Sequence, residues 1–554
     1  MGNLTVINVI KDHGAKGDGK TDDTSAIQSA LNDSTLAGNL PYTQTGGIVY
    51  FPRGTYLISQ NLLRQYSNTQ CVGEGKNATT IKIDVAGWKG NASPTEPTLS
   101  FMFDLASYSV KDCLISDLTI DGSAGQIQAT MNAGSWSGIL CSQRSIIERV
   151  SIYDVWGFGL WVFGDSASFT RIIDCDADLG LGVVGGKDCI GGGAKRTSLV
   201  RFHWMSGLQK NTAMDMTTSG TEASVSLYDC ANESVKDVVL EGVSQSVIHG
   251  CRFYGCNLHL SNDAGYGHGT ITNPADITVS NCIFAPWEGD NVRPAAPGGG
   301  LQVSFDGGDH QMTSMPKFTN LGGRIAVLGN SFYECNDSAI KWTGDDNSTS
   351  SGGSVISNNR IYDPNSNGTE AAVIIEGAFG DIAKLYSCGI AVAESAGLSI
   401  LNNTINDDRT TQLMQYSMQL QSADGVGLDG KSERIVVTGN LCGTQDNQGN
   451  GSVATFFPVN WVPQTTLNPN PKLLKNLNQP NGLDSAAAFT NGQDWPPGGG
   501  YPYDALILIS GGSGVIVNIQ GDNTGRTDGA FYLPVGQKIN IRWTSQPTIN
   551  VFPM

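Results

Sequence analysis

The chain has 554 residues, of which 70 are glycine and only 15% are charged, with 33 Lys and Arg against 51 Asp and Glu. The net charge of −18 repels polyanions over most of the surface, which argues against nucleic acid as a partner. No segment is apolar over the length that a membrane span needs, so we predict no membrane insertion. The stretch Met1 to Thr5 lacks the basic start of a signal peptide, which we expect to be absent or already removed.

The first predicted elements are a helix and a pair of strands. In TDDTSAIQSAL, the apolar residues from Ala26 to Leu31 recur at helical spacing, and Asp22 and Asp23 precede them, where caps and the helix dipole favour acidic residues. We expect this helix to cover one open end of a solenoid. The segment GGIVYFPRGTYLIS then predicts a strand, a turn and a second strand.

A short repeat runs through the middle of the chain and reads apolar-x-apolar-x-x-(Asn or Cys)-x-apolar. Its alternation predicts a strand with one buried face, and the two-residue step predicts a tight corner before a second strand. Coils of roughly 25–30 residues with variable insertions are the mark of a β-solenoid. The last apolar position recurs at Ile120, Ile152, Phe253, Phe284, Phe332, Ile361, Ile405 and Cys442.

The Asn at the corner has a physical role, because its side chain tolerates unusual backbone angles and can bond to the coils on either side. Cys251 and Cys282 occupy the same position and are therefore interpreted as structural. The twelve Cys include no CxxC pair. We expect buried free thiols and synthesis in a reducing cytoplasm.

Beyond residue 442 the repeat is lost. We predict a parallel β-helix over 1–442 with an N-terminal cap region at 1–47, a loop-rich connector over 443–503, and a small C-terminal β module over 504–554. The last of these begins with the apolar strand ALILIS.

The opening segments INVIKDHGAKGDGKTDDTSAIQSAL, GGIVYFPRGTYLIS and CVGEGKNATTI, from Ile7 to Ile83, resemble the pectate-lyase-like superfamily of right-handed parallel β-helices. They look most like the tailspike depolymerases of bacteriophages, and the repeats extend the resemblance to about Cys442. The resemblance implies an all-β fold, a homotrimer, attachment to other virion tail proteins, and a bacterial surface polysaccharide as substrate. It also implies synthesis in the host cytoplasm and action outside the cell. It says little about the reaction, because the superfamily includes lyases, hydrolases, epimerases and non-enzymes.

Candidate catalytic residues follow from the chemistry of glycoside hydrolysis, which needs two carboxyl groups on an open groove. Outward side chains of successive coils lie about 4.8 Å apart, so carboxyl groups one or two coils apart are suitably spaced. Asp215 lies between Met214 and Met216, and strand alternation directs it outward. Asp188 and Glu241, near apolar anchors of neighbouring coils, are its candidate partners, although Asp188 also fits a turn.

Candidate substrate-binding residues lie in the same stretch and beyond it. Trp156 and Trp161 belong to an aromatic segment, and an exposed aromatic face can stack on a sugar ring. A cluster buried in the core or in a trimer interface is the alternative. His259, Gln302 and Lys341 continue an outward polar row that either binds glycan or is simply solvated.

Other acidic residues are better explained as solvent-exposed or loop residues than as parts of a functional site. Asp174, Asp176 and Asp178 alternate onto one face as a predicted acidic ridge in solvent. Asp345 and Asp346 fit a polar loop better than a calcium site, and no His-Cys cluster suggests zinc. We predict no cofactor and no metal.

The leading hypothesis is a phage tailspike depolymerase that hydrolyses a capsular or O-antigen polysaccharide. One alternative is a polysaccharide lyase or epimerase, secreted or phage-borne, that uses His259 or Lys341. The other is a non-enzymatic adhesin that binds glycan through the C-terminal module.

Overall fold

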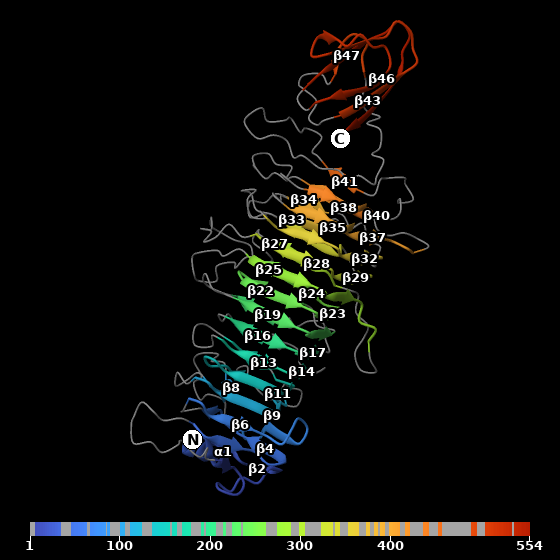
Figure 1. Ribbon diagram of the computed structural model, residues 1–554. Coiled ribbons are helices and arrows are strands. Elements are labelled where there is room, and N and C mark those ends of the chain that lie inside the picture. The colour runs from blue at the N-terminus through green and yellow to red at the C-terminus, as the bar shows by residue number, and fades with distance from the viewer. Residues whose placement is uncertain are drawn as a thin grey trace.

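The computed structural model describes most of the chain. The described residues are 6–34, 46–63, 67–84, 86–88, 100–105, 111–123, 136–155, 158–162, 169–178, 190–192, 196–205, 214–217, 224–233, 237–261, 274–289, 299–304, 323–335, 338–343, 353–364, 373–376, 382–385, 388–393, 398–409, 416–421, 436–442, 453–456, 489–495, 505–534 and 537–553. They form a long stack of coils, with α1 at one end and the C-terminal strands at the other (Figure 1). Within them no helix is long and apolar enough to cross a membrane.

Two parallel sheets build the stack, confirming the predicted all-β parallel β-helix. The larger, here called the bent sheet, has 26 strands, two for most coils, on either side of a corner. Its strands are β1 (Val6–Asn8), β2 (Asp18–Asp22), β3 (Ile48–Tyr50), β4 (Gly54–Ile58), β6 (Gln70–Val72), β7 (Thr79–Ile83), β9 (Leu114–Asp121), β11 (Ile146–Tyr153), β13 (Arg171–Ile173), β14 (Asp176–Asp178), β16 (Thr197–Val200), β17 (His203–Met205), β19 (Val225–Tyr228), β20 (Ala231–Glu233), β22 (Ser244–His249), β23 (Arg252–Tyr254), β25 (Ala275–Ser280), β26 (Ile283–Ala285), β28 (Ala326–Leu328), β29 (Ser331–Tyr333), β31 (Val355–Ser357), β32 (Arg360–Tyr362), β36 (Ser399–Leu401), β37 (Thr404–Asn406), β39 (Val436–Thr438) and β40 (Leu441–Cys442).

The smaller sheet, here called the flat sheet, has 13 strands, one for each coil that it crosses. Its strands are β5 (Leu62–Leu63), β8 (Ser100–Asp104), β10 (Trp136–Leu140), β12 (Leu160–Trp161), β15 (Ile190–Gly192), β18 (Met214–Thr217), β21 (Asp237–Glu241), β24 (Asn257–Ser261), β27 (Leu301–Ser304), β30 (Ile340–Thr343), β35 (Cys388–Ala393), β38 (Tyr416–Gln421) and β41 (Val453–Phe456). A hairpin of β33 (Val373–Glu376) and β34 (Ile382–Leu385) adds an antiparallel pair.

The predicted repeat corresponds to the observed register. Phe253, Phe284 and Phe332 pair in parallel across neighbouring coils, and Ile361, Ile405 and Cys442 continue the same row. The three Phe rings stack with centroids 4.6 Å apart. Since every one of these rings is buried, the row forms the centre of the core, as the apolar period predicts.

The corner of the bent sheet has the same backbone shape in every coil that the structure describes from β9 to β40. One residue there adopts a left-handed conformation with φ between 51° and 67°. These residues are Asp117, Arg149, Asp174, Arg201, Asp229, Gly250, Asn281, Gly329, Asn358, Asn402 and Gly439. Asn, Asp and Gly tolerate this region, whereas Arg is strained in it.

The residue after each corner points into the core and stacks on its counterparts. Asn330, Asn359, Asn403 and Asn440 form a fully buried ladder in which each Oδ1 accepts the backbone N–H of the coil before. Each Nδ2 donates to a carbonyl of the preceding coil, as in the 3.0 Å bond from Asn330 to Val279 O. This ladder confirms the role predicted for the recurring Asn.

Cys residues take the same position in earlier coils. The Sγ of Cys282 lies 3.7 Å from Ile248 O, which corresponds to the carbonyl that Asn330 reaches one coil later. Burial raises the pKa of the Cys175 thiol to about 12, so this thiol stays protonated. Ten of the described Cys, from Cys71 to Cys388, are free and buried, which confirms their structural interpretation.

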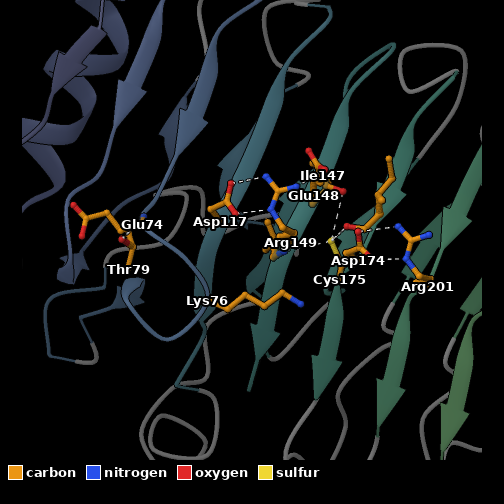
Figure 2. Close-up of polar contacts among 12 residues, drawn as sticks. Glu74, Lys76, Thr79, Asp117, Ile147, Glu148, Arg149, Asp174, Cys175 and Arg201 are labelled. Carbon is orange, nitrogen blue, oxygen red and sulfur yellow. Dashed lines mark hydrogen bonds and ion pairs between the residues drawn. The ribbon is translucent and has the colours of Figure 1, made fainter.

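Ion pairs join the corners of successive coils. Arg149 binds Asp117 through two hydrogen bonds of 2.6 and 2.7 Å, and Arg201 binds Asp174 through bonds of 2.5 and 2.9 Å (Figure 2). The Arg149 guanidinium holds the pKa of the Asp117 carboxyl below its ordinary value. The expected acidic ridge is therefore wrong in part, because Asp174 is paired with Arg201 and Asp176 with Lys76.

The helix α1 (Thr24–Asp33) lies at the N-terminal end, as predicted, and buries Ile27, Ala30 and Leu31 in the common core. Asp22 Oδ1 accepts the Thr24 N–H at 3.0 Å, whereas the N-cap residue Asp23 makes no side-chain cap bond. The Asp23 carboxylate instead accepts the N–H groups of Lys16 and Gly17 and so fixes the preceding loop.

The C-terminal strands are antiparallel. They are β42 (Asp494–Trp495), β43 (Ala505–Ser510), β44 (Ile516–Ile519), β45 (Asp522–Asn523), β46 (Gly529–Leu533), β47 (Ile539–Arg542) and β48 (Thr548–Pro553). Eight buried residues, among them Ile507, Val517 and Phe531, form a core of their own. Two strands, β41 and β42, fall within the segment expected to be a connector.

The Asn ladder yields a prediction for stability. Asn359→Ala leaves the buried Asn330 N–H without its acceptor, and we expect the free energy of unfolding to fall by about 1–3 kcal/mol. Asn359→Cys should lower the free energy of unfolding by less than Asn359→Ala, because Cys fills this position in earlier coils. Urea unfolding measures both variants, with the exposed neighbour Arg360→Ala as control. An Asn359→Ala variant as stable as the control would contradict the ladder's contribution.

The corner pairs yield a prediction for pH. Because the pKa of Asp117 is lowered in the folded state, its stabilisation is present above the unfolded value near 3.8 and is lost as pH falls through the lower folded value. Arg149→Gly removes the pair but relieves the left-handed strain. We expect the stability of the wild type relative to Arg149→Gly to be greater at pH 7 than at pH 3.

The matched variant Arg149→Ala loses the pair and keeps the strain, so it should be less stable than Arg149→Gly by up to about 1 kcal/mol at both pH values. Thermal unfolding of the three proteins at each pH makes the comparison. An unchanged difference between wild type and Arg149→Gly across the two pH values would contradict the ion-pair assignment.

Candidate functional site

The residues of the predicted row share one register position on the flat sheet. Parallel pairing places Trp161, Gly191, Asp215, Val239, His259, Gln302 and Lys341 at successive positions of one row, one strand apart. The row therefore joins one predicted catalytic residue to four predicted binding residues along the helix axis. Neighbouring members are separated by about 4.8 Å, the spacing of paired strands.

The pairing register beside Asp215 is not fixed by the sequence pattern. Leu160 pairs with Ile190, and Ile190 pairs with Met214 rather than with Met216. Met214 and Met216 are both fully buried, so a period of two fits either anchor and cannot choose between them. Asp188 lies outside the described residues, as does Trp156.

The strand β21 carries an unusual pair of carboxyl groups. Val238 and Leu240 point into the core with no exposure, so alternation directs Asp237, Val239 and Glu241 outward. Asp237 is nevertheless only 6% exposed and Glu241 only 5% exposed. Two shielded carboxyl groups thus lie on the outer face of one strand.

His259 on β24 lies beside Asp237. Its Nε2 is 3.2 Å from Asp237 Oδ1, while the same oxygen accepts a 2.8 Å hydrogen bond from Asn257 Nδ2. The His259 Nε2 atom is buried and makes no hydrogen bond to any residue that the structure describes. An imidazole nitrogen can act as a hydrogen-bond donor or acceptor, depending on its tautomer.

Glu241 and Asp215 are diagonal neighbours. Glu241 pairs with Thr217 on β18, two residues after Asp215, and with Ser261 on β24. The strand rise and strand spacing put the Cα positions of Asp215 and Glu241 about 8 Å apart. The candidate reaction centre, as named from here on, comprises Asp215, Asp237, Glu241 and His259, from three adjacent strands.

Sequence analysis missed Asp237. The signal was present, because in DVVLE the two acidic residues are four apart and alternation puts both on one face. What could not be seen was the burial of both carboxyl groups and the approach of His259, since both depend on the next coil.

The remaining predicted residues have mixed positions. Trp161 is partly exposed and makes an edge contact with Phe158, with ring centroids 4.1 Å apart. Lys341 on β30 is partly exposed and lies three strands beyond Val239, and four beyond Asp215, along the row. No group of three or more His, Cys, Asp or Glu suited to a metal ion occurs among the described residues.

Residues 6–100 match a family model described as rhamnogalacturonase A/epimerase, pectate lyase-like. Over these residues, which include the opening motif, the chain is similar to that family. Alginate lyase 7 of Azotobacter vinelandii is 36% identical over 157 residues, which are 26% of this chain and 17% of that protein. A probable glucan endo-1,3-beta-glucosidase of Arthroderma benhamiae is 44% identical over 79 residues, covering 14% of this chain and 9% of that protein. The chain therefore spans less than a fifth of the length of either relative.

Among solved structures, the chain is similar to the Dettilon tailspike protein, which is 13% identical; the match covers 99% of this chain and 93% of that one, with a TM-score of 0.49. The A-module of the mannuronan C-5 epimerase AlgE4 of Azotobacter vinelandii is 16% identical, covers 82% of this chain and 91% of its own, and gives a TM-score of 0.38.

Proposed function

We propose that this pectate-lyase-like protein is a phage tailspike depolymerase that hydrolyses a bacterial capsular or O-antigen polysaccharide at the candidate reaction centre. The observation that carries the proposal is the diagonal placement of Asp215 and Glu241 on neighbouring strands. Inverting glycosidases separate their two carboxyl groups by about 6.5–9.5 Å to admit a water molecule, and the Cα spacing here is compatible with that range.

The two carboxyl groups would divide the work of a glycosidase. Glu241 is shielded from solvent, which suits a general acid that protonates the leaving oxygen. Asp215 would activate the water on the opposite face of the sugar. Asp237 and His259 would complete the polar surroundings, and Trp161, two strands before Asp215, would support a sugar ring further along the row.

The row itself supports a polymeric substrate. Equivalent positions recur at each coil along the helix axis, so an extended glycan lying along the flat sheet would meet Trp161, His259, Gln302 and Lys341 in turn. We further propose that the protein is a homotrimer attached to other tail proteins. It would be synthesised in the host cytoplasm and act outside the cell. These proposals rest on the sequence resemblance to tailspikes.

A second reaction is favoured by one specific contact, the approach of His259 Nε2 to Asp237 Oδ1. An imidazole held at this position would serve as the base that β-elimination or epimerisation of a uronate requires. Lys341, two strands along the row, would neutralise a uronate carboxylate. The alginate lyase and epimerase relatives favour this alternative by their activities.

The hydrolase proposal predicts that Glu241→Gln lowers kcat on a responsive polysaccharide by about 10²–10⁴-fold, because a proton donor is lost. The assay counts new reducing ends after digestion of polysaccharide extracted from a strain that the protein clears. Glu148→Gln, a carboxylate of the bent sheet, is the matched control and should retain full activity. Circular dichroism checks that both variants fold. Full activity of Glu241→Gln would refute the assigned role.

The two reactions differ in their products. Hydrolysis releases reducing ends without absorbance near 235 nm, whereas elimination adds the absorbance of an unsaturated uronate. We expect no absorbance from the wild-type protein and reducing ends that survive in His259→Asn at a lowered rate. Absorbance that appears with the wild type and vanishes in His259→Asn would replace hydrolysis by elimination. Binding without either signal on every responsive strain would leave an adhesin.

A further inference from the structure

The outer face of the bent sheet beyond the corner is hollowed. One hollow of about 420 Å³ is lined by residues of β14 and β17 together with Lys76 and Tyr153. A second, of about 510 Å³, is lined by residues of β17, β20 and the start of β23. Arg201 and His203 line both hollows, so the two form one groove along the helix axis. Each volume falls within the range of small-molecule sites.

Polar side chains in this groove are fixed in position by hydrogen bonds and ion pairs with one another. His203 Nε2 lies 2.8 Å from Glu233 Oε2, and Tyr153 Oη donates to Asp176 Oδ2 at 3.4 Å. Lys76 pairs with Asp176, and Arg201 pairs with Asp174 at the edge. A carboxylate accepts several hydrogen bonds at once, so these groups retain acceptor capacity while their positions are fixed. Fixed acceptors and donors on a concave surface suit the hydroxyl groups of a sugar.

The strand row that passes through Glu233 leads beyond the groove to tyrosine residues. Glu233 pairs with Tyr254 on the next strand, and two coils further the same row reaches Tyr333 and Tyr362. The rings of Tyr333 and Tyr362 lie parallel with centroids 5.7 Å apart, and Tyr333 is 39% exposed. Tyrosine combines a flat apolar surface with a polar tip, and such rings commonly face sugars.

The charges of the side chains that line the groove limit which class of ligand can bind there. Its basic side chains are Lys76, Arg201 and Arg252, beside His203, whereas its carboxylates are Asp174, Asp176, Asp178, Asp229 and Glu233. Acidic groups are in excess, so a polyanionic segment would be repelled. An uncharged saccharide segment would not be repelled by these carboxylates.

We propose that this groove binds an uncharged stretch of the polysaccharide, on the face of the helix next to the candidate reaction centre. The two faces are close along the chain, since only Gly255 and Cys256 separate β23 from β24. The groove would hold the polymer while the flat sheet acts on it, and repeating positions at each coil suit a repeating ligand. This inference rests on the proposed function in taking a polysaccharide as ligand.

Binding is measured with arrayed, purified neutral and uronate-containing bacterial polysaccharides, using Glu241→Gln as the background so that no probe is cleaved. We expect neutral polysaccharide to bind more tightly than uronate-containing polysaccharide. The double variant Glu233→Ala/Arg252→Ala should weaken binding of the neutral probe at least tenfold, and Tyr333→Ala should weaken long chains more than short fragments.

Arg171→Ala is the matched control, because Arg171 is an exposed arginine of β13 that lines neither hollow. It should bind within twofold of the background protein. Unchanged binding in the folded double variant overturns the proposal, as does an array on which no neutral polysaccharide binds. Failure of the proposed hydrolysis appears separately, as full activity of Glu241→Gln in the reducing-end assay.

Discussion

The left-handed residue at the corner of each coil is the constraint on which the rest of this structure depends. It turns the chain between the two strands of the bent sheet within two residues, and it recurs with nearly the same φ from Asp117 to Gly439. Because the corners have one shape, the coils stack in register, and each side chain meets its counterpart in the next coil. The Phe row, the Asn ladder and the outward rows all follow from that repetition.

The left-handed corner position accepts several residue types, for different physical reasons. Where Gly or Asn occupies it, the backbone angle is tolerated directly. Arg149 and Arg201 are poorer choices for this angle, yet each makes a bidentate pair with the Asp of the preceding corner. Each pair also places a positive charge beside a carboxylate in a chain whose net charge is −18.

The same stacking makes the protein suited to an extended ligand. Flat-sheet residues from Trp161 to Lys341 form a single file, and the bent-sheet groove runs parallel to it. The two faces differ in chemistry. The flat sheet gathers shielded carboxyl groups and an imidazole, as proton transfer requires, whereas the groove offers paired charges and tyrosine rings, as binding requires. A polymer that contacts both would be held at several coils at once.

The sequence by itself determined the parallel β-helix, the capping helix, the corner Asn ladder and the row through His259, Gln302 and Lys341. The helix follows from apolar residues at helical spacing, and the other features follow from strand alternation and a recurring corner motif; all of these are visible in one dimension. Tertiary structure alone decided the pairing of Ile190 with Met214, the burial of Asp237 and Glu241, and the partners of Asp174 and Asp176. The physical reason is that alternation fixes which face a side chain is on, while coil length between strands, set by loops of variable length, fixes which side chain lies beside it.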